Sequence, residues 1–96
     1  MNIQAIMKQA QEMQKKIGKA QAELETMTFI GKSSFVEVEI TGSGLVKKVS
    51  ISSEDNIDNE MLEDMILIAT NEAMEQMKKE KERKLGSYTQ GMSGLF

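Results

Sequence analysis

The chain has 96 residues and a formal net charge of −3, which arises from 12 basic and 15 acidic side chains. It contains neither cysteine nor histidine, which excludes disulfides, thiolate–metal sites and histidine-based acid–base chemistry. No apolar run reaches transmembrane length and no signal-peptide stretch opens the chain, so we expect a cytoplasmic protein without a membrane segment.

Residues 1–27 are assigned to a long first helix, whose pattern begins at about Asn2. Apolar side chains recur there at alternating steps of three and four, which is a heptad seam. The members of this seam are Ile3, Ile6, Ala10, Met13, Ile17, Ala20, Leu24 and Met27. So narrow a stripe suits packing against one other helix. The partner is either the second helix of the same chain, which we favour because it carries a matching stripe, or a second copy.

Residues 28–52 are predicted to form an antiparallel hairpin or a three-stranded sheet. Val36, Val38 and Ile40 alternate with polar residues, which gives a strand with one apolar face. The sequence Gly42-Ser43-Gly44 suits a tight reversal, and a bulge at Lys47-Lys48 would restore the alternation in the return strand. Residues 28–34 are interpreted as a short edge strand and a turn. Because a lone hairpin is marginal in water, we expect the helices to pack on it.

Residues 59–84 are predicted to form the second helix, with Asp58 as its N-cap and Gly86 as its stop. Its first half is apolar around most of the circumference, which indicates burial on several sides. Its second half ends in KKEKERK, which is charged all round and must be solvated or bound to a partner. Residues 85–96 are rich in glycine and serine and are expected to form a flexible tail.

Charge is segregated along the chain. Residues 1–20 carry four lysines against one glutamate, and residues 76–96 carry five basic residues against two glutamates. The segment 21–75 holds three lysines and twelve acids. If the two helices pack antiparallel, the basic ends meet and form an arm with a basic tip. Such a tip is either a phosphate-contacting surface or a solvated helix end whose charges pair locally.

Sites for chemistry are not apparent. The acid-rich stretch 54–64 lacks the fixed ligand spacing and the central glycine of a calcium loop, so it is interpreted as a capped helix start. Residues 41–44 join strand to strand and are too short to cradle a phosphate. No nucleophile lies near a suitable base. We therefore predict no catalytic residue, no metal site, no cofactor and no small-molecule substrate.

Four segments together resemble one known family. They are MKQAQEMQKKI, VEVEITGSGLVKKVSIS, NEMLEDMILIATNEAMEQMKKEKERKLG and a glycine-rich ending that closes on Gly94-Leu95-Phe96. Their order and spacing resemble the YbaB/EbfC family of bacterial nucleoid-associated proteins over nearly the whole chain. The resemblance implies an α+β, tweezer-like homodimer in which the sheets build the body and the helices form arms. The tail departs from the family because it lacks the proline common near its end.

The resemblance also implies a function. Family members bind duplex DNA through the arm helices, alter its conformation, and have proposed roles in nucleoid organisation and gene regulation, which implies localisation to the nucleoid. Carried onto this chain, the DNA-binding positions are the basic residues of the two helices, namely Lys8, Lys15, Lys16, Lys19, Lys78, Lys79, Lys81, Arg83 and Lys84. With a single arginine in the chain, bidentate reading of guanine is scarce, so we predict little sequence specificity.

The alternative function is a dimeric adaptor that clasps another protein through its helical arms or its acidic sheet face, without DNA contact. The net negative charge, the nine methionines and the heptad seam favour this alternative. The two functions differ in their response to salt, because phosphate contacts weaken steeply as salt rises and apolar contacts do not.

Overall fold

The computed structural model describes residues 2–52 and 56–89 of the chain. The predicted α+β order of helix, antiparallel sheet and helix is confirmed. The elements are α1 (Ile3–Glu25), β1 (Thr28–Ser33), β2 (Val36–Thr41), β3 (Val46–Ile51) and α2 (Asn59–Thr89).

Helix α1 begins and ends at side-chain caps. The Asn2 carboxamide oxygen accepts hydrogen bonds from the backbone amides of Gln4 at 3.1 Å and Ala5 at 3.3 Å, which satisfies two free amides of the first turn. At the other end the Thr26 hydroxyl donates to the Glu23 carbonyl at 2.7 Å. The expected extension of the helix to residue 27 is wrong, because Met27 has left the helix and its carbonyl accepts from the Gly42 amide at 3.0 Å.

The sheet has the order β1-β2-β3, and both pairings are antiparallel. The alternation in β2 puts Val36, Val38 and Ile40 on one face, and all three are fully buried. The register of β2 with β3 shifts between Glu39 and Ile40, where Lys48 and Val46 lie opposite. Residue 47 is therefore the extra residue of a bulge, as predicted from the broken alternation.

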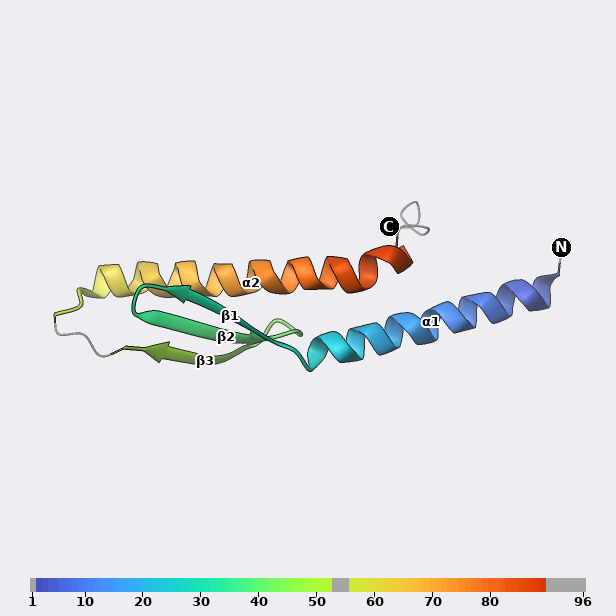
Figure 1. The fold of residues 1–96 in the computed structure, drawn as a ribbon, viewed down its shortest axis with the longest axis horizontal. Coiled ribbons are helices and arrows are strands. Elements are labelled where there is room, and N and C mark those ends of the chain that lie inside the picture. Colours follow the sequence, from blue (N-terminus) through green and yellow to red (C-terminus); the bar gives the residue numbers. More distant parts are fainter. Residues whose placement is uncertain (1, 53–55, 90–96) are drawn as a thin grey trace.

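The core lies between the sheet and α2, which packs on β1 and β2 (Figure 1). Small residues allow this close approach. A Cβ atom at Gly31 of β1 would lie 1.9 Å from the backbone oxygen of Ala69 of α2, and both Ala69 and Ala73 are fully buried. The helix backbone thus lies directly on the strand, and the larger side chains Phe29 and Leu24 belong to the same core.

Strand β3 is left uncovered. Val46, Val49 and Ile51 share a face with the buried residues of β2, as their pairing shows, yet 45–53% of each is exposed. The opposite edge of the sheet is treated differently, because Gln76 of α2 donates a hydrogen bond from Nε2 to the Ile30 carbonyl of β1 at 2.9 Å. One edge is therefore capped by α2 and the other is open.

The predicted limits of the second helix are right at the start and wrong at the end. The Asp58 carboxylate accepts from the Glu60 amide at 3.2 Å, as expected of a helix start. The helix continues through Gly86 to Thr89, although Gly86 was expected to stop it. Burial of Leu85 and half-burial of Tyr88 offset the roughly 1 kcal/mol that a helical glycine costs. The predicted tail is thus helical over residues 85–89, and residues 90–96 lie outside the described residues.

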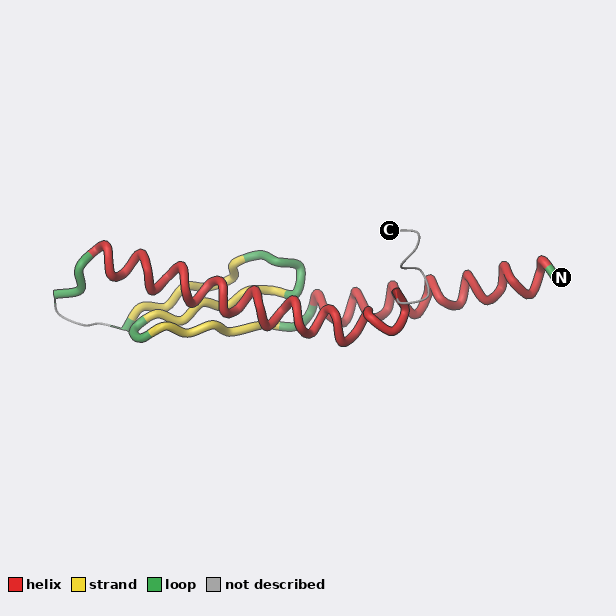
Figure 2. The backbone as a smooth tube through the Cα atoms, turned by 90° about the horizontal axis from the view of Figure 1, so that it is seen from above, coloured by secondary structure: helices red, strands yellow, loops and turns green. Residues whose placement is uncertain are grey.

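The molecule is elongated, with extents of 71 × 24 × 14 Å. Helices α1 and α2 run antiparallel and overlap only where they leave the sheet, so the first half of α1 projects alone (Figures 1 and 2). The heptad seam is divided accordingly. Ile17, Ala20, Leu24 and Met27 are at least half-buried, whereas Ile3, Ile6 and Met13 are 70%, 50% and 41% exposed. The favoured intramolecular pairing is therefore right only for the second half of the seam.

Candidate nucleic-acid interface

The twelve basic side chains are distributed unequally between helices and sheet. Three of them, Lys32, Lys47 and Lys48, lie on β1 and β3. The nine predicted DNA-binding residues all lie on the helices: Lys8, Lys15, Lys16 and Lys19 on α1, and Lys78, Lys79, Lys81, Arg83 and Lys84 on α2. All nine are exposed except Lys84, which is half-buried.

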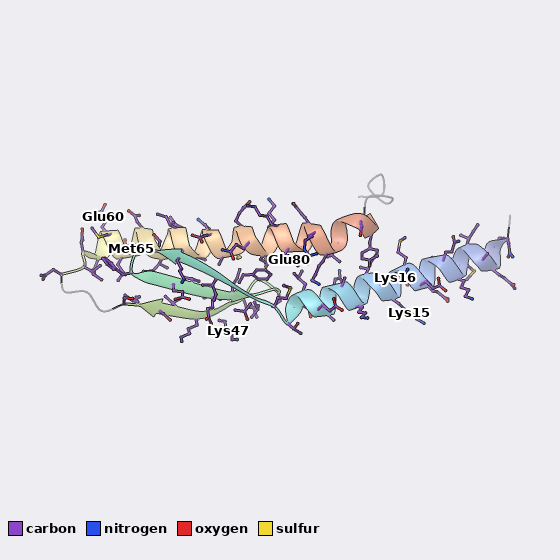
Figure 3. The ribbon with its side chains drawn as sticks, in the orientation of Figure 1. Lys15, Lys16, Lys47, Glu60, Met65 and Glu80 are labelled. Carbon is purple, nitrogen blue, oxygen red and sulfur yellow. The ribbon has the colours of Figure 1, made fainter. Side chains whose placement is uncertain are left out.

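The four lysines of α1 occupy two sides of the helix. Lys8, Lys15 and Lys19 follow one another at steps of seven and four, so they form a stripe along one side. Lys16 lies on the side of α1 that faces the end of α2, and Lys15, which is about 100° away around the helix, is turned from it (Figure 3). Lys19 lies between these two directions and lines the space beside α2 together with Lys16.

On α2, Arg83 is held by Glu80 one turn earlier. The guanidinium donates from Nε to Oε2 at 3.1 Å, and a second hydrogen bond joins Nη2 to Oε1. This hydrogen-bonded pairing lowers the pKa of the Glu80 carboxyl and raises the pKa of Arg83. The only arginine of the chain is thus partly neutralised by its own helix, although it lies in a segment of high positive charge.

Lys84 has a different role from its neighbours. Its ammonium lies 3.3 Å from a carboxylate oxygen of Glu23 on α1, and its side chain is only 20% exposed. Within the described part of the chain this is the one ion pair that joins the two helices. Lys84 is therefore engaged in fixing α1 beside α2.

The predicted meeting of the two basic ends is only partly right. The end of α2 lies beside the second half of α1, where Tyr88 and Lys16 line one cleft and Lys84 pairs with Glu23. Lys8 lies beyond this overlap, on the projecting half of α1 (Figure 1). The physical reason is that α2 lies on the sheet over its first half, so only its last turns extend to α1.

A cleft opens where the two helices diverge. It has a volume of about 350 Å³ and is lined by Lys16, Lys19, Ala20, Glu23 and Tyr88. An adjoining hollow of about 280 Å³ shares Lys16 and Tyr88 with it. Tyr88 was not among the predicted site residues, because the sequence placed it in a tail. The one sequence feature that could have identified Tyr88 as a site residue is its position directly after the basic segment.

The outer face of the sheet is balanced in charge. Glu37 lies opposite Lys32 in the register of β1 with β2, and Glu39 lies opposite Lys48 in that of β2 with β3. The acidic sheet face on which the adaptor alternative depended is therefore matched by basic residues across the strands.

Two further findings concern metal binding and membrane-spanning helices. Over residues 2–52 and 56–89, no group of three or more acidic side chains is arranged to hold a metal ion. Neither helix, over its described length, contains an apolar stretch long enough to cross a membrane.

Known proteins resemble this chain over nearly its whole length. A model of the YbaB/EbfC DNA-binding family matches residues 1–92. A nucleoid-associated protein of Lactococcus lactis subsp. cremoris is 42% identical over 96 residues, covering 96% of this chain and 97% of its own length. A nucleoid-associated protein of Enterococcus faecalis is 40% identical over 98% of this chain and 94% of its own length. One from Streptococcus pneumoniae is 42% identical over 92% and 93%.

Proposed function

Because this chain belongs to the YbaB/EbfC DNA-binding family, we propose that it binds duplex DNA as a nucleoid-associated protein. The observation that carries this proposal is the placement of nine of its twelve basic side chains on the two helices, mostly exposed. Its site of action is then the nucleoid, in the cytoplasm. Its role is binding without catalysis, and the proposed DNA contacts are the nine basic residues of α1 and α2.

Binding of this kind rests on phosphate contacts. Lysine ammonium groups act as point charges toward phosphate and carry no sequence information. Arg83, the one side chain suited to bidentate reading of guanine, is already held by Glu80. The proposal therefore includes weak sequence preference and strong dependence on salt.

We propose further that two copies associate through the uncovered side of the sheet. Val46, Val49 and Ile51 form an exposed apolar row there. Each of the three is paired in register with a buried residue of β2, so the row continues the core face of the sheet to its open edge.

The occupant of this surface is a second copy of the chain. The open β3 edge and the apolar row are adjacent, and burying both would enlarge a core that is small in a 96-residue chain. A homodimer so formed carries two projecting α1 arms. Two basic arms attached to one body would contact a duplex at two places, which constrains its path and so alters its conformation.

The test is a fluorescence-anisotropy titration of random-sequence duplex DNA, with the mass of the protein measured alongside. Binding through about six phosphates should lose on the order of a thousandfold in affinity from about 50 to about 200 mM salt. Glutamine at positions 78, 79, 81, 83 and 84 should weaken binding. Because the change at 84 also removes the ion pair with Glu23, circular dichroism checks that the fold is retained. The matched control places glutamine at Lys32, Lys47 and Lys48 of the sheet and should retain most of the affinity.

One observation supports the adaptor as a second candidate function. The projecting half of α1 exposes Ile3, Ile6, Met7 and Met13, an apolar row with no partner among the described residues. A protein that binds no DNA at low salt would favour the adaptor and contradict the proposed function. Salt-sensitive binding that survives the five substitutions on α2 would contradict the assignment to that helix.

A further inference from the structure

The cleft between α1 and α2 combines two basic side chains of one helix with a hydroxyl-bearing side chain of the other. Lys16 and Lys19 reach it from α1, and the half-buried Tyr88 reaches it from α2. Its volume of about 350 Å³ is ample for a phosphate group with bound water. A group bound in this cleft can therefore be held from two sides.

The charges in the cleft are not balanced. Glu23 is the carboxylate among its lining residues, and it is already paired with Lys84 at 3.3 Å. Neither Lys16 nor Lys19 takes part in an ion pair within the described residues. Glu12 lines only the adjoining hollow. Two positive charges therefore face the cleft without a committed partner.

The carboxyl end of α2 disfavours an anion in the cleft, so its effect must be compared with that of the two lysines. The carboxyl end of a helix carries a partial negative charge of about half a unit. Two lysine ammonium groups supply two full positive charges on the other wall. The net field in the cleft is thus positive, and the Tyr88 hydroxyl adds a hydrogen-bond donor of the kind that proteins use toward phosphate oxygens.

We propose that this cleft seats one phosphate group of bound DNA, with Lys16 and Lys19 supplying charge and Tyr88 supplying a hydrogen bond. The inference rests on the proposed function and makes it more specific. A phosphate held from both helices lies at the junction of α1 with α2 rather than on the projecting tip. The duplex is thereby positioned against the base of the arm, and Tyr88 becomes a binding residue that carries no charge.

The test is a double-mutant cycle on DNA affinity that compares two adjacent lysines. Tyr88→Phe keeps the ring and removes the hydroxyl, and it should weaken binding about three- to tenfold without changing the salt dependence. The same loss should disappear in a Lys16→Gln background, because the two residues share one phosphate. Lys15→Gln is the matched control, since Lys15 is adjacent in the sequence and is not among the residues that line the cleft. In that background the loss should persist in full.

Two results of this cycle would overturn the inference while leaving DNA binding intact. The Tyr88→Phe protein could bind DNA as tightly as the parent protein, which would show that the hydroxyl does not contribute to binding. Alternatively, the loss could be equal in both lysine backgrounds, which shows that Tyr88 and Lys16 do not share a phosphate. Thermal unfolding of each variant, followed by circular dichroism, confirms that the fold is retained.

The cleft could also bind free inorganic phosphate instead of a phosphate of DNA. Intrinsic fluorescence distinguishes these two ligands. Tyr88 is the only tyrosine and the chain has no tryptophan, so ultraviolet-excited emission reports on this cleft. Inorganic phosphate, titrated against chloride at equal ionic strength, should change that emission in the Lys15→Gln protein and not in the Lys16→Gln protein. The same response from a protein that binds no duplex would assign the cleft to free phosphate and overturn its assignment to DNA.

Discussion

Single residues set how much positive charge the helices present. Glu80 is the clearest case, because its carboxylate holds the guanidinium of Arg83 through two hydrogen bonds. The pairing lowers the pKa of Glu80, so the stability that it contributes is present above the ordinary range of glutamate. That contribution is lost as the pH falls through the lowered pKa. Acid therefore releases Arg83 only below the pH at which an unpaired glutamate is protonated.

Glu80→Gln should accordingly strengthen DNA binding. It removes one negative charge and frees Arg83, and the gain should be about two- to fivefold, as for the loss of one exposed ion pair. Glu82→Gln is the matched control, because it makes the same change of charge at a residue without an ion pair in the described structure. Anisotropy titrations at low salt measure both. Equal gains from the two variants would show that Arg83 is not restrained by Glu80.

Two glycines give a second prediction at this scale. Gly31→Ala would bring a Cβ to 1.9 Å from the Ala69 oxygen and should destabilise the protein by about 2–3 kcal/mol or more. Gly18→Ala meets nothing within 4 Å on exposed α1 and should stabilise that helix by about 1 kcal/mol. Urea denaturation measures the free energy of unfolding in each case. A Gly31→Ala protein as stable as the parent would contradict the close approach of β1 to α2.

At the scale of the elements, α1 is attached to the body over a short length. Leu24 is the one buried residue in this helix, at 4% exposure. The Glu23–Lys84 pair and the hydrogen bond from Gly42 to Met27 lie beside it. In the first half of the helix the seam residues Ile3, Ile6 and Met13 are exposed. The helix is thus fixed at its carboxyl end, and its amino end is supported only by its own hydrogen bonds.

Leu24→Ala should loosen α1 selectively. Removing a buried leucine costs about 2–5 kcal/mol, and here that loss falls on the attachment of one helix. Hydrogen–deuterium exchange should accelerate along α1 much more than in the central strand β2. Ile3→Ala, at a residue that is 70% exposed, is the control and should leave exchange in the sheet unchanged. Equal acceleration in α1 and β2 would mean that they unfold together.

The elements were predictable where a local pattern determines them. The alternation of Val36, Val38 and Ile40 specifies a strand with one buried face, and its interruption at residue 47 specifies the bulge. The end of α2 was not predictable in this way, because Gly86 signals a stop that the packing of Leu85 against the body outweighs. The local sequence pattern carries no information about that tertiary contact.

The candidate site was predictable in composition and not in arrangement. Helical spacing identifies the lysines, but the stagger of α1 against α2 depends on how much of α2 the sheet covers. That stagger brings Lys16 to Tyr88 and leaves Lys8 beyond the overlap. A residue such as Tyr88, whose place beside α1 depends on this stagger, has no signature of its own in the sequence.

At the scale of the whole molecule, the uncovered β3 row determines how copies would associate. Val49→Asp should convert the proposed dimer to a folded monomer, because it places a charge in the apolar row without entering the buried core. Ile6→Asp, on the projecting half of α1, is the control and should leave the dimer intact. Light scattering after size-exclusion chromatography gives the mass. A Val49→Asp protein that remains a dimer would exclude this surface.

The two edges of the sheet have unequal capacities for assembly. A sheet with two open edges can add strands at both sides and grow into a fibre, whereas a sheet with one open edge can add a neighbour only once. The Gln76 carboxamide occupies the Ile30 carbonyl at the β1 edge, and α2 covers that side. The two edges therefore differ in what they can accept, because β3 is free to pair with a further strand and the Ile30 carbonyl of β1 is already bonded to α2. The proposed association through β3 would thus leave the β1 edge in contact with its own helix.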